Sequence, residues 1–270
     1  MKRAINQKRI SGLFFRLMML FASGCILLFI IAPLAGMFLN CSGTDLMTTA
    51  ADREVQNSIW LTLFAAMTGT LLFSVLAIPF AWMLARKDFP FKGLVGGIVD
   101  LPVVIPHSAA GIALLGILSR NSMMGSLAEK AGFSFIGSYA GIVVAMAFVS
   151  LPFLINAARD GFSEVPERIE KTALSLGASP ARVFFTISLP LAWRSILSGL
   201  IMMWARGLSE FGAVIIIAYH PMTTPVLIFE RFSSFGLKYA QPVATLFILI
   251  CLVIFILLRL ASGSGKYDRT

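Results

Sequence analysis

A charged pair stands inside one of the longest apolar stretches of this 270-residue sequence. Arg206 and Glu210 are four residues apart, with Ser209 between them, so they share one face of a helix and can form an ion pair. Charged residues inside a membrane-spanning helix face the protein interior or a water-filled path and often serve transport. The pair can therefore be interpreted in two ways: it takes part in moving a solute, or it is a purely structural ion pair.

Two prolines interrupt another apolar stretch. They are Pro102 and Pro106, and His107 follows the second directly. Each proline removes a backbone hydrogen-bond donor and bends a helix. Because a break in a membrane helix is tolerated only where protein or water lies beside it, a simple kink and a place on a solute pathway both fit. Together with the charged pair, these residues form the candidate pathway set.

The longest charged interval of the chain covers residues 159–194. Its charged side chains cannot sit comfortably in hydrocarbon. An early proline, acidic residues near the start and apolar residues at helical spacing predict a helix over 166–176, which Gly177 ends. This segment is therefore expected to fold outside the apolar layer.

A second short helix is predicted directly after the first. Ser179 and Pro180 supply its cap and first turn, and Pro190 is expected to close it. Its apolar side is formed by Val183, Phe184 and Ile187. A pair of short amphipathic helices on the water side of a membrane protein can dock into a partner, or it can simply anchor the chain at the interface.

No motif for catalysis, metal binding or nucleotide binding is found. The three cysteines, Cys25, Cys41 and Cys251, are scattered and match no metal or redox spacing. The tail Gly263–Lys266 resembles part of a phosphate-binding loop, but Tyr267 replaces the required Ser or Thr and the first glycine of that motif is missing. We therefore expect no catalytic residue, no metal, no cofactor and no ATP hydrolysis by this chain.

Composition places the chain in a membrane. Hydrophobic residues make up 58% and charged residues 13% of it, whereas soluble domains carry about a quarter charged residues. The net charge of +9 is not taken as a sign of nucleic-acid binding. The first apolar stretch is too long for a cleaved signal peptide. The sequence predicts one domain, 1–270, with six spans at about 17–39, 57–85, 93–118, 138–158, 195–219 and 240–260.

The distribution of basic residues predicts the orientation. The two chain ends, the loop around Arg86 and the interval 159–194 carry most of the 22 Lys and Arg residues. Basic residues gather on the cytoplasmic side of membrane proteins. Both termini and the charged interval are therefore expected in the cytoplasm of a multi-pass protein of the cell membrane.

Four residues of the charged interval have the spacing of a known motif. Gly177, Ile187, Leu189 and Pro190 resemble the G-x9-I-x-L-P core of the EAA loop in permease subunits of binding-protein-dependent ABC importers, and Ala173 fits the second alanine of that motif. The first two positions depart from it, since Lys171 stands where the family has Glu and Thr172 where it has Ala. Glu170, one residue earlier, is the candidate for the missing acid.

Further segments resemble the permeases of molybdate and tungstate importers. They are the run Ser175–Phe185, the run Leu189–Trp193 and the block Ala205–Ala213, part of which sulfate permeases share. The segment Leu101–Pro106 resembles one in oxyanion permeases, with His107 in place of the usual second proline. The resemblance covers most of the chain, from the second span to the end.

The resemblance implies an all-α integral membrane protein with six transmembrane helices and a cytoplasmic coupling helix, the type I ABC importer permease fold. It implies two ATPase subunits, a second copy of this chain, an extracytoplasmic binding protein and the lipid bilayer as partners. The ATPase would contact the coupling loop 159–194, at Glu170, Lys171, Ala173, Gly177, Ala178, Ser179, Pro180, Arg182, Val183, Ile187, Leu189 and Pro190.

Three alternatives stay open on the sequence. A permease for sulfate or another small anion shares part of the motifs. A secondary transporter driven by an ion gradient would need paired repeats and ionisable residues deep in the membrane, and only the pair Arg206 and Glu210 meets the second condition. A purely structural assembly subunit is the third. Which oxyanion is carried is not encoded in any residue named above.

Overall fold

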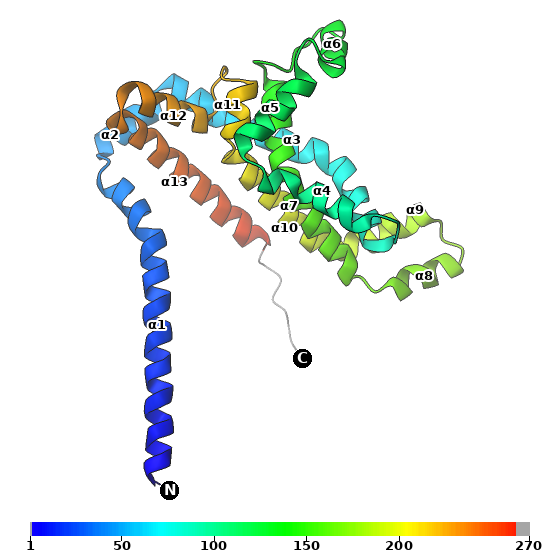
Figure 1. Ribbon diagram of the computed structural model, residues 1–270, viewed down its shortest axis with the longest axis horizontal. Helices are drawn as coiled ribbons and strands as arrows, with labels where there is room; N and C mark the ends of the chain where they lie inside the picture. Colours follow the sequence, from blue (N-terminus) through cyan, green and yellow to red (C-terminus); the bar gives the residue numbers. More distant parts are fainter. Residues whose placement is uncertain (1, 263–270) are drawn as a thin grey trace.

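The computed structural model describes residues 2–262, with side chains for residues 15–258, and these residues contain no strand. The side chains at both chain ends, 1–14 and 259–270, lie outside this part, as does the tail Gly263–Lys266. In chain order the helices are α1 (Lys2–Leu39), α2 (Gly43–Ala51), α3 (Arg53–Arg86), α4 (Lys92–Val104), α5 (His107–Leu118), α6 (Met123–Lys130), α7 (Tyr139–Glu164), α8 (Glu167–Ser175), α9 (Pro180–Val183), the π-helix η1 (Phe184–Ser188), α10 (Leu189–Leu208), α11 (Gly212–Ile217), α12 (Thr224–Phe235) and α13 (Leu237–Ser262) (Figure 1).

Five helices are long and apolar enough to cross a membrane. They lie in α1, α3 and α7, in the continuous helix Pro180–Leu208, and in α13. The pair α4 and α5 gives a sixth crossing if the two bent pieces count as one span. The helices thus overlap each of the six segments expected from the sequence.

The third of these segments is broken far more sharply than by a simple kink. Helix α4 ends at Val104, α5 begins at His107, and the two helix axes are bent by 111°. Ile105, the residue before Pro106, has ψ 147, because the proline ring disfavours the helical conformation of its predecessor. Pro102 lies inside α4 and is buried.

The fifth segment differs from the expectation at both ends. An unbroken helix over 195–219 was expected, but α10 ends at Leu208 and α11 begins at Gly212, so Glu210 lies outside both helices. Pro190 does not close the second short helix, since α9, η1 and α10 follow one another without interruption. The wider π-turn lies directly before Pro190, where the ring of a proline would otherwise clash with the helix backbone.

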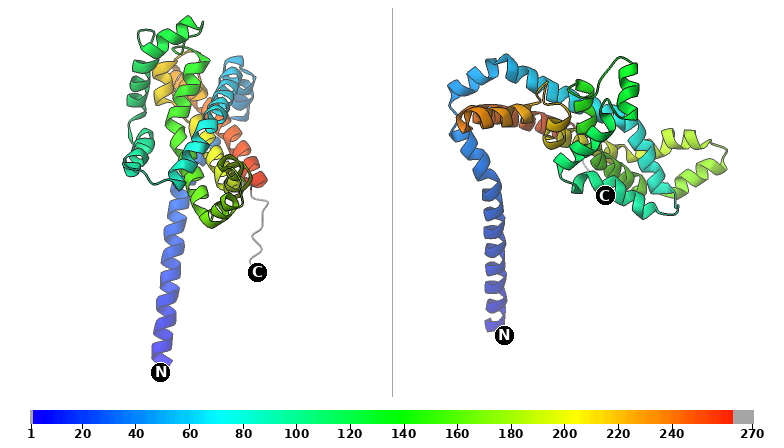
Figure 2. Two further views of the ribbon diagram at one scale, coloured as in Figure 1. Left: turned by 90° about the vertical axis from the view of Figure 1, so that its right-hand side faces the viewer. Right: turned by 45° about the horizontal axis from the view of Figure 1, so that its top comes forward.

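Helices α3, α7 and α10 form the central bundle (Figures 1 and 2). Ile142, Met146 and Leu154 of α7 are fully buried in it. Small residues permit the close approach of the backbones: a Cβ added at Gly69 of α3 would lie 3.2 Å from the carbonyl oxygen of Val143. Ala65 and Gly69, two small residues four positions apart in α3, are both buried on this packed face.

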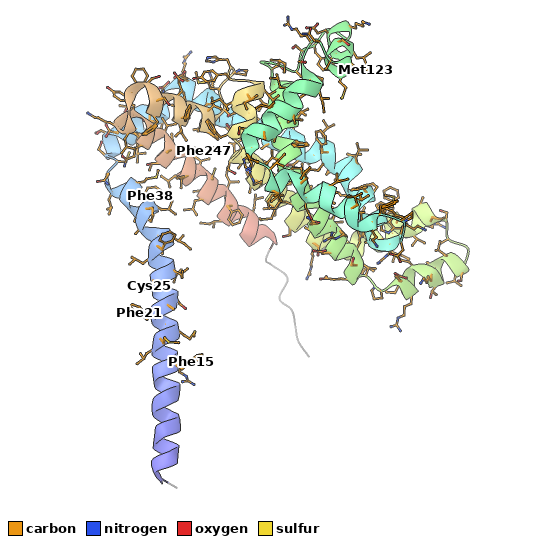
Figure 3. The ribbon with its side chains drawn as sticks, in the orientation of Figure 1. Phe15, Phe21, Cys25, Phe38, Met123 and Phe247 are labelled. Atoms are coloured by element: carbon orange, nitrogen blue, oxygen red, sulfur yellow. The ribbon has the colours of Figure 1, made fainter. Side chains whose placement is uncertain are left out.

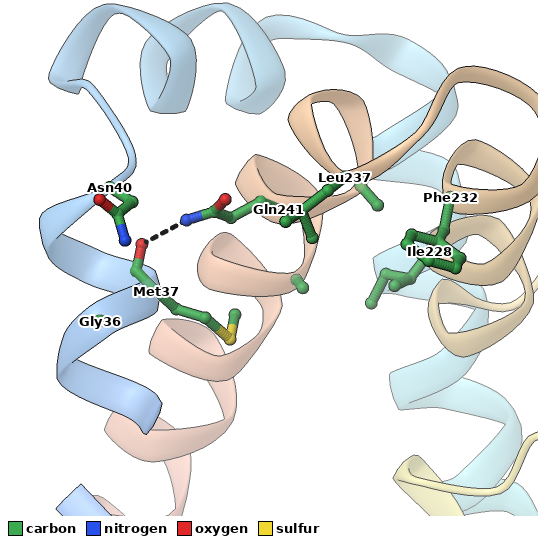
Figure 4. Close-up of a pocket in the computed structure, with 9 residues that line it drawn as sticks. Gly36, Met37, Asn40, Ile228, Phe232, Leu237 and Gln241 are labelled. Carbon is green, nitrogen blue, oxygen red and sulfur yellow. Dashed lines mark hydrogen bonds between the residues drawn. The ribbon is translucent and has the colours of Figure 1, made fainter. Parts of the chain in front are cut away.

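Helix α1 stands apart from the bundle (Figures 1 and 2). The side chains of residues 15–34 are exposed, among them Phe15, Phe21 and Cys25, which point away from the column on several sides (Figure 3). Among the described side chains, those near the end of α1 lie against the rest of the chain, and Gln241 Nε2 of α13 donates a hydrogen bond of 3.0 Å to the carbonyl oxygen of Met37. The pocket beside this bond is lined by Gly36, Asn40, Ile228, Phe232 and Leu237, among others (Figure 4).

Ion pairs connect α12 to the start of α3. Arg231 Nη2 lies 2.6 Å from Asp52 Oδ2 and 3.2 Å from Glu54 Oε2. Asp52 also caps α3, since its Oδ1 accepts a bond of 2.9 Å from the backbone N–H of Glu54. The hydrogen bond from Arg231 lowers the pKa of the Asp52 carboxyl below its ordinary value of 3.8.

The close packing of α7 and α10 predicts the effect of one added methyl group. In Gly161→Ala the new Cβ would lie 2.4 Å from Ser195 Cβ, so one helix must shift, and overpacking of this kind costs about 1–3 kcal/mol of unfolding free energy. Gly116→Ala in α5 is the control, because nothing lies within 4 Å of that Cβ position. Thermal unfolding in detergent should show a lower midpoint for Gly161→Ala alone, and equal midpoints would contradict the packing.

The Asp52 and Arg231 pair predicts a pH-dependent stability. The pKa of the Asp52 carboxyl is lower in the folded chain than its ordinary value. The carboxylate therefore contributes its full stabilisation of the fold at pH values above the ordinary pKa, and this stabilisation is lost as the pH falls through the lowered pKa. Asp52→Asn retains the helix cap but not the charge. We expect it to lower the thermal midpoint at pH 7, and we expect this difference from the unchanged chain to be smaller at about pH 3, where part of the Asp52 contribution is lost. A difference that is the same at both pH values would contradict the assignment.

Candidate coupling and translocation sites

The charged interval forms a helical hairpin at one end of the molecule (Figures 1 and 2). Its first helix, α8, begins after Pro166 and ends at a C-terminal glycine cap. Gly177 has φ +88, its N–H donates to the carbonyl of Leu174 at 3.0 Å, and the N–H of Ala178 donates to the carbonyl of Ala173 at 3.1 Å. This is the Schellman arrangement, which satisfies the last carbonyls of a helix and favours glycine at the left-handed position.

The second helix of the hairpin begins as expected. The hydroxyl of Ser179 accepts a bond of 3.3 Å from the N–H of Arg182, and Pro180 is at the first position of α9. Through η1 the hairpin then passes directly into α10. The second helix of the hairpin and this span are therefore one continuous helical element, Pro180–Leu208.

Glu170 faces inward, against Arg86 at the end of α3. The guanidinium donates from Nε to Oε2 and from Nη2 to Oε1, each at 2.9 Å, and the Ser188 hydroxyl donates to Oε1 at 2.7 Å. Nη2 also donates to the carbonyl of Val165 at 2.8 Å. Since the Glu170 side chain is only 10% exposed, it does not present an acid to a partner.

The apolar side chains expected to seat a partner are turned the other way. Val183 is buried, and the ring of Phe184 packs against Trp82 and Phe162 at centroid distances of 5.6 and 6.1 Å. Val183, which was expected to help seat a partner together with Phe184 and Ile187, thus packs in the chain's own core, and Phe184 is half-buried against that core. Ile187 and Leu189 are half-buried.

Other apolar residues of the hairpin are exposed in their place. Leu176 is 83% and Phe185 65% exposed, and Leu174 is exposed as well. Leu174 and Phe185 were not among the residues singled out from the sequence, because apolar periodicity does not show which helix face the protein covers. Four residues of the predicted set are exposed on the hairpin as well: Lys171, Ser179, Pro180 and Arg182.

The second candidate site joins residues from two broken spans. Arg206 Nη2 lies 2.7 Å from His107 Nε2 and 3.1 Å from Glu210 Oε2, and His107 Nδ1 lies 3.1 Å from the same carboxylate oxygen. Arg206 Nη1 donates to the Ser209 hydroxyl at 3.1 Å. The expected pair of Arg206 and Glu210 forms. The two residues were expected on one helix, but α10 ends at Leu208, between them.

Glu210 is the fixed member of this cluster. It is fully buried, and its Oε1 accepts a bond of 2.9 Å from the backbone N–H of Ala213. Its Oε2 approaches Arg206 and His107 but is outside hydrogen-bonding geometry with either, so the attraction to the Arg206 guanidinium is electrostatic. Arg206 and His107 retain partial exposure, with side chains 20% and 37% exposed.

Close backbone contact brings the two breaks together. A Cβ added at Gly212 would lie 2.7 Å from His107 Cβ, and one at Gly111 would lie 3.0 Å from Ala213 Cα. Pro106 is the N-cap residue of α5 at this junction. Pro102 does not reach the cluster but lines an apolar pocket between α3, α4 and α7.

A further polar contact in the membrane-spanning region lay outside the predicted set. Asn156 Nδ2 of α7 donates to Asp100 Oδ1 of α4 at 2.6 Å, and both residues are half-buried. The two positions are 56 residues apart, so no local pattern connects them. The contact fixes the bent half α4 against the central bundle.

The chain matches the family described as binding-protein-dependent transport system inner membrane component over residues 77–263. The chain belongs to this family. The permease is 44% identical to the molybdate/tungstate transport system permease protein WtpB of Thermococcus kodakarensis, covering 88% of this chain and 92% of that protein. It is 32% identical to a probable sulfate transport system permease protein, cysT, of Chlorokybus atmophyticus, covering 77% and 74%.

A solved structure shows the same fold at low sequence identity. A chain of a bacterial ABC transporter involved in the import of the acidic polysaccharide alginate superposes with a TM-score of 0.75 at 18% identity, covering 96% of this permease and 99% of that chain. The permease therefore has the all-α, multi-pass fold of type I ABC importer subunits.

The buried carboxylate predicts a strong effect of a nearly isosteric change. Glu210→Gln retains an acceptor for the Ala213 N–H but removes the charge opposite Arg206, and loss of one partner of a buried ion pair costs about 3 kcal/mol. Glu129→Gln, which breaks an exposed pair with Arg120, is the control, because exposed pairs contribute little. Thermal unfolding should separate the two variants clearly. Equal stability of Glu210→Gln and the unchanged permease would contradict the account.

Proposed function

We propose that this chain is the transmembrane permease subunit of an ATP-driven importer that carries molybdate or tungstate across the cell membrane. The 44% identity to a molybdate/tungstate permease over 88% of the chain carries this proposal. The lower identity to the sulfate permease supports molybdate or tungstate over sulfate. The permease chain itself supplies the path, and a separate ATPase subunit supplies the energy.

The proposed orientation places the hairpin in the cytoplasm. Arg86 and Lys87 end α3 next to the hairpin, and Arg159, Arg168 and Arg182 lie in or beside it. The excess of basic residues at this end supports a cytoplasmic location. Both chain termini are proposed to lie on the cytoplasmic side. The opposite end of the molecule, which contains α2, α6 and α12, is proposed to lie on the outer side, where an extracytoplasmic binding protein would deliver the anion.

The proposed assembly contains two copies of this chain and two ATPase subunits. The exposed apolar column of α1 supports contacts outside the chain, with lipid and with the second copy. The exposed surface of the hairpin, with Leu174, Leu176, Phe185, Lys171 and Arg182, supports docking into an ATPase. The apolar residues provide buried area on docking, and the two cations provide electrostatic orientation.

The translocation path is proposed to pass the cluster at the two broken spans. An anion cannot cross hydrocarbon without a compensating charge, and Arg206 is partly exposed beside His107 and Ser209. Glu210 holds Arg206 in place, and Pro106 starts the helix that brings His107 to it. Pro102 is proposed to shape α4 rather than to contact the anion.

Reconstitution in vesicles tests the proposed function. Vesicles that hold the permease, the cognate ATPase and the binding protein should take up labelled molybdate only when ATP is supplied, and unlabelled tungstate should compete better than sulfate. Vesicles with the permease alone should show no uptake. Uptake by the permease alone, driven by an ion gradient, would support the secondary transporter instead.

The glycine cap of the hairpin predicts a selective loss of coupling. Gly177→Val strains a position with φ +88, whereas Gly132→Val strains φ +86 in the loop after α6, and neither Cβ meets a neighbour. Left-handed backbone disfavours β-branched residues equally at both sites. We expect Gly177→Val alone to reduce co-purification of the ATPase and ATP-dependent uptake. Equal uptake by the two variants would contradict a docking role of the hairpin.

A further inference from the structure

One guanidinium holds the hairpin to the central bundle. Arg86, the last residue of α3, binds both carboxylate oxygens of Glu170 in α8 and the carbonyl of Val165 at the end of α7. Through Glu170 the contact extends to the Ser188 hydroxyl, the last residue of the π-helix. Four elements therefore meet at one point, which we call the Arg86 node: Arg86, Val165, Glu170 and Ser188.

The geometry of the node favours a rigid joint. The side chains of Arg86 and Glu170 are 7% and 10% exposed, so solvent screens their attraction only weakly. The fork of arginine matches a carboxylate in one orientation, which adds angular definition that a point charge lacks. Arg86 Nη2 donates a further bond to the Val165 carbonyl, and Glu170 Oε1 accepts a further bond from the Ser188 hydroxyl, so each group of the pair is also held by a second partner.

The other contacts of α8 do not provide such a joint. Lys171 and Glu167 form a pair of 2.7 Å within the same helix, but their side chains are 73% and 53% exposed. The apolar residues Ile169 and Leu174 are exposed. Among the described side chains of α8, Glu170 is thus the one that is buried, and the helix is held to the bundle mainly through it.

We propose that Arg86 and Glu170 are positioning residues that convert movement of the hairpin into movement of the spans. A push on α8 is passed at one point to the end of α3, to the end of α7 and, through Ser188, to the start of α10. Without the node, α8 is joined to the bundle by backbone at its two ends and can move alone. This inference rests on the proposed coupling of the hairpin to an ATPase.

The test compares uptake with ATP hydrolysis in the complete reconstituted importer. Arg86→Lys retains the charge but not the fork, and Glu170→Gln retains the shape but not the charge. For both we expect the ATPase to co-purify and hydrolyse ATP, while molybdate taken up per ATP falls by about tenfold. Ser188→Ala, which removes one bond to Glu170, should give a smaller loss in the same direction.

Glu167→Gln is the matched control, because it breaks the exposed ion pair on the same helix and should leave the ratio of uptake to hydrolysis unchanged. The proposal is overturned if the importers with Arg86→Lys and Glu170→Gln take up as much molybdate per ATP hydrolysed as the unchanged importer. It is also overturned if uptake and hydrolysis fall in proportion because the complex no longer assembles, since the node would then have only a structural role. Failure of the unchanged importer to show ATP-dependent uptake would instead reject the proposed function.

Discussion

The need to pair every backbone polar group inside hydrocarbon constrains the whole arrangement of this permease. An unpaired N–H or C=O costs several kcal/mol there, so a helix can break only where other protein groups surround the break. The two breaks, at Ile105 and at Glu210, lie against each other through the close contact of Gly212 and His107. At the second break the Glu210 carboxylate accepts the N–H of Ala213, the second residue of α11. The same carboxylate then attracts Arg206, so the charged cluster and the broken backbone stabilise each other.

The local signals of the sequence predicted the hairpin well. Gly177, Ser179 and Pro180 act through bonds within four residues, so their types and spacing suffice to place the turn and the second helix start. The resemblance of the chain to importer permeases is confirmed by the family match over residues 77–263. The pairing of Arg206 and Glu210 was also predictable, because a spacing of four residues brings side chains together even where the helix ends between them.

Contacts between distant segments could not be predicted in this way. Arg86 and Glu170 are 84 residues apart, and no local sequence pattern around either residue indicates that the two are in contact. Periodicity shows that Val183 and Phe184 share a helix face, but it does not show whether that face meets the chain's own core or a partner. Pro190 was expected to end a helix because proline usually does so, and the π-turn before it removes the conflict. These three outcomes all depend on packing that forms only after the helices assemble.

The uninterrupted helix from Pro180 to Leu208 has a mechanical consequence. It contains 29 residues, and a helix rises about 1.5 Å per residue, so it is roughly 43 Å long. One end carries the hairpin and the other carries Arg206. Such a rod acts as a lever: for each degree that it swings about its hairpin end, the far end is displaced by about 0.7 Å. In the proposed coupling, a rotation of several degrees at the hairpin end would shift the charged cluster by several ångströms, without any bond within the rod having to break.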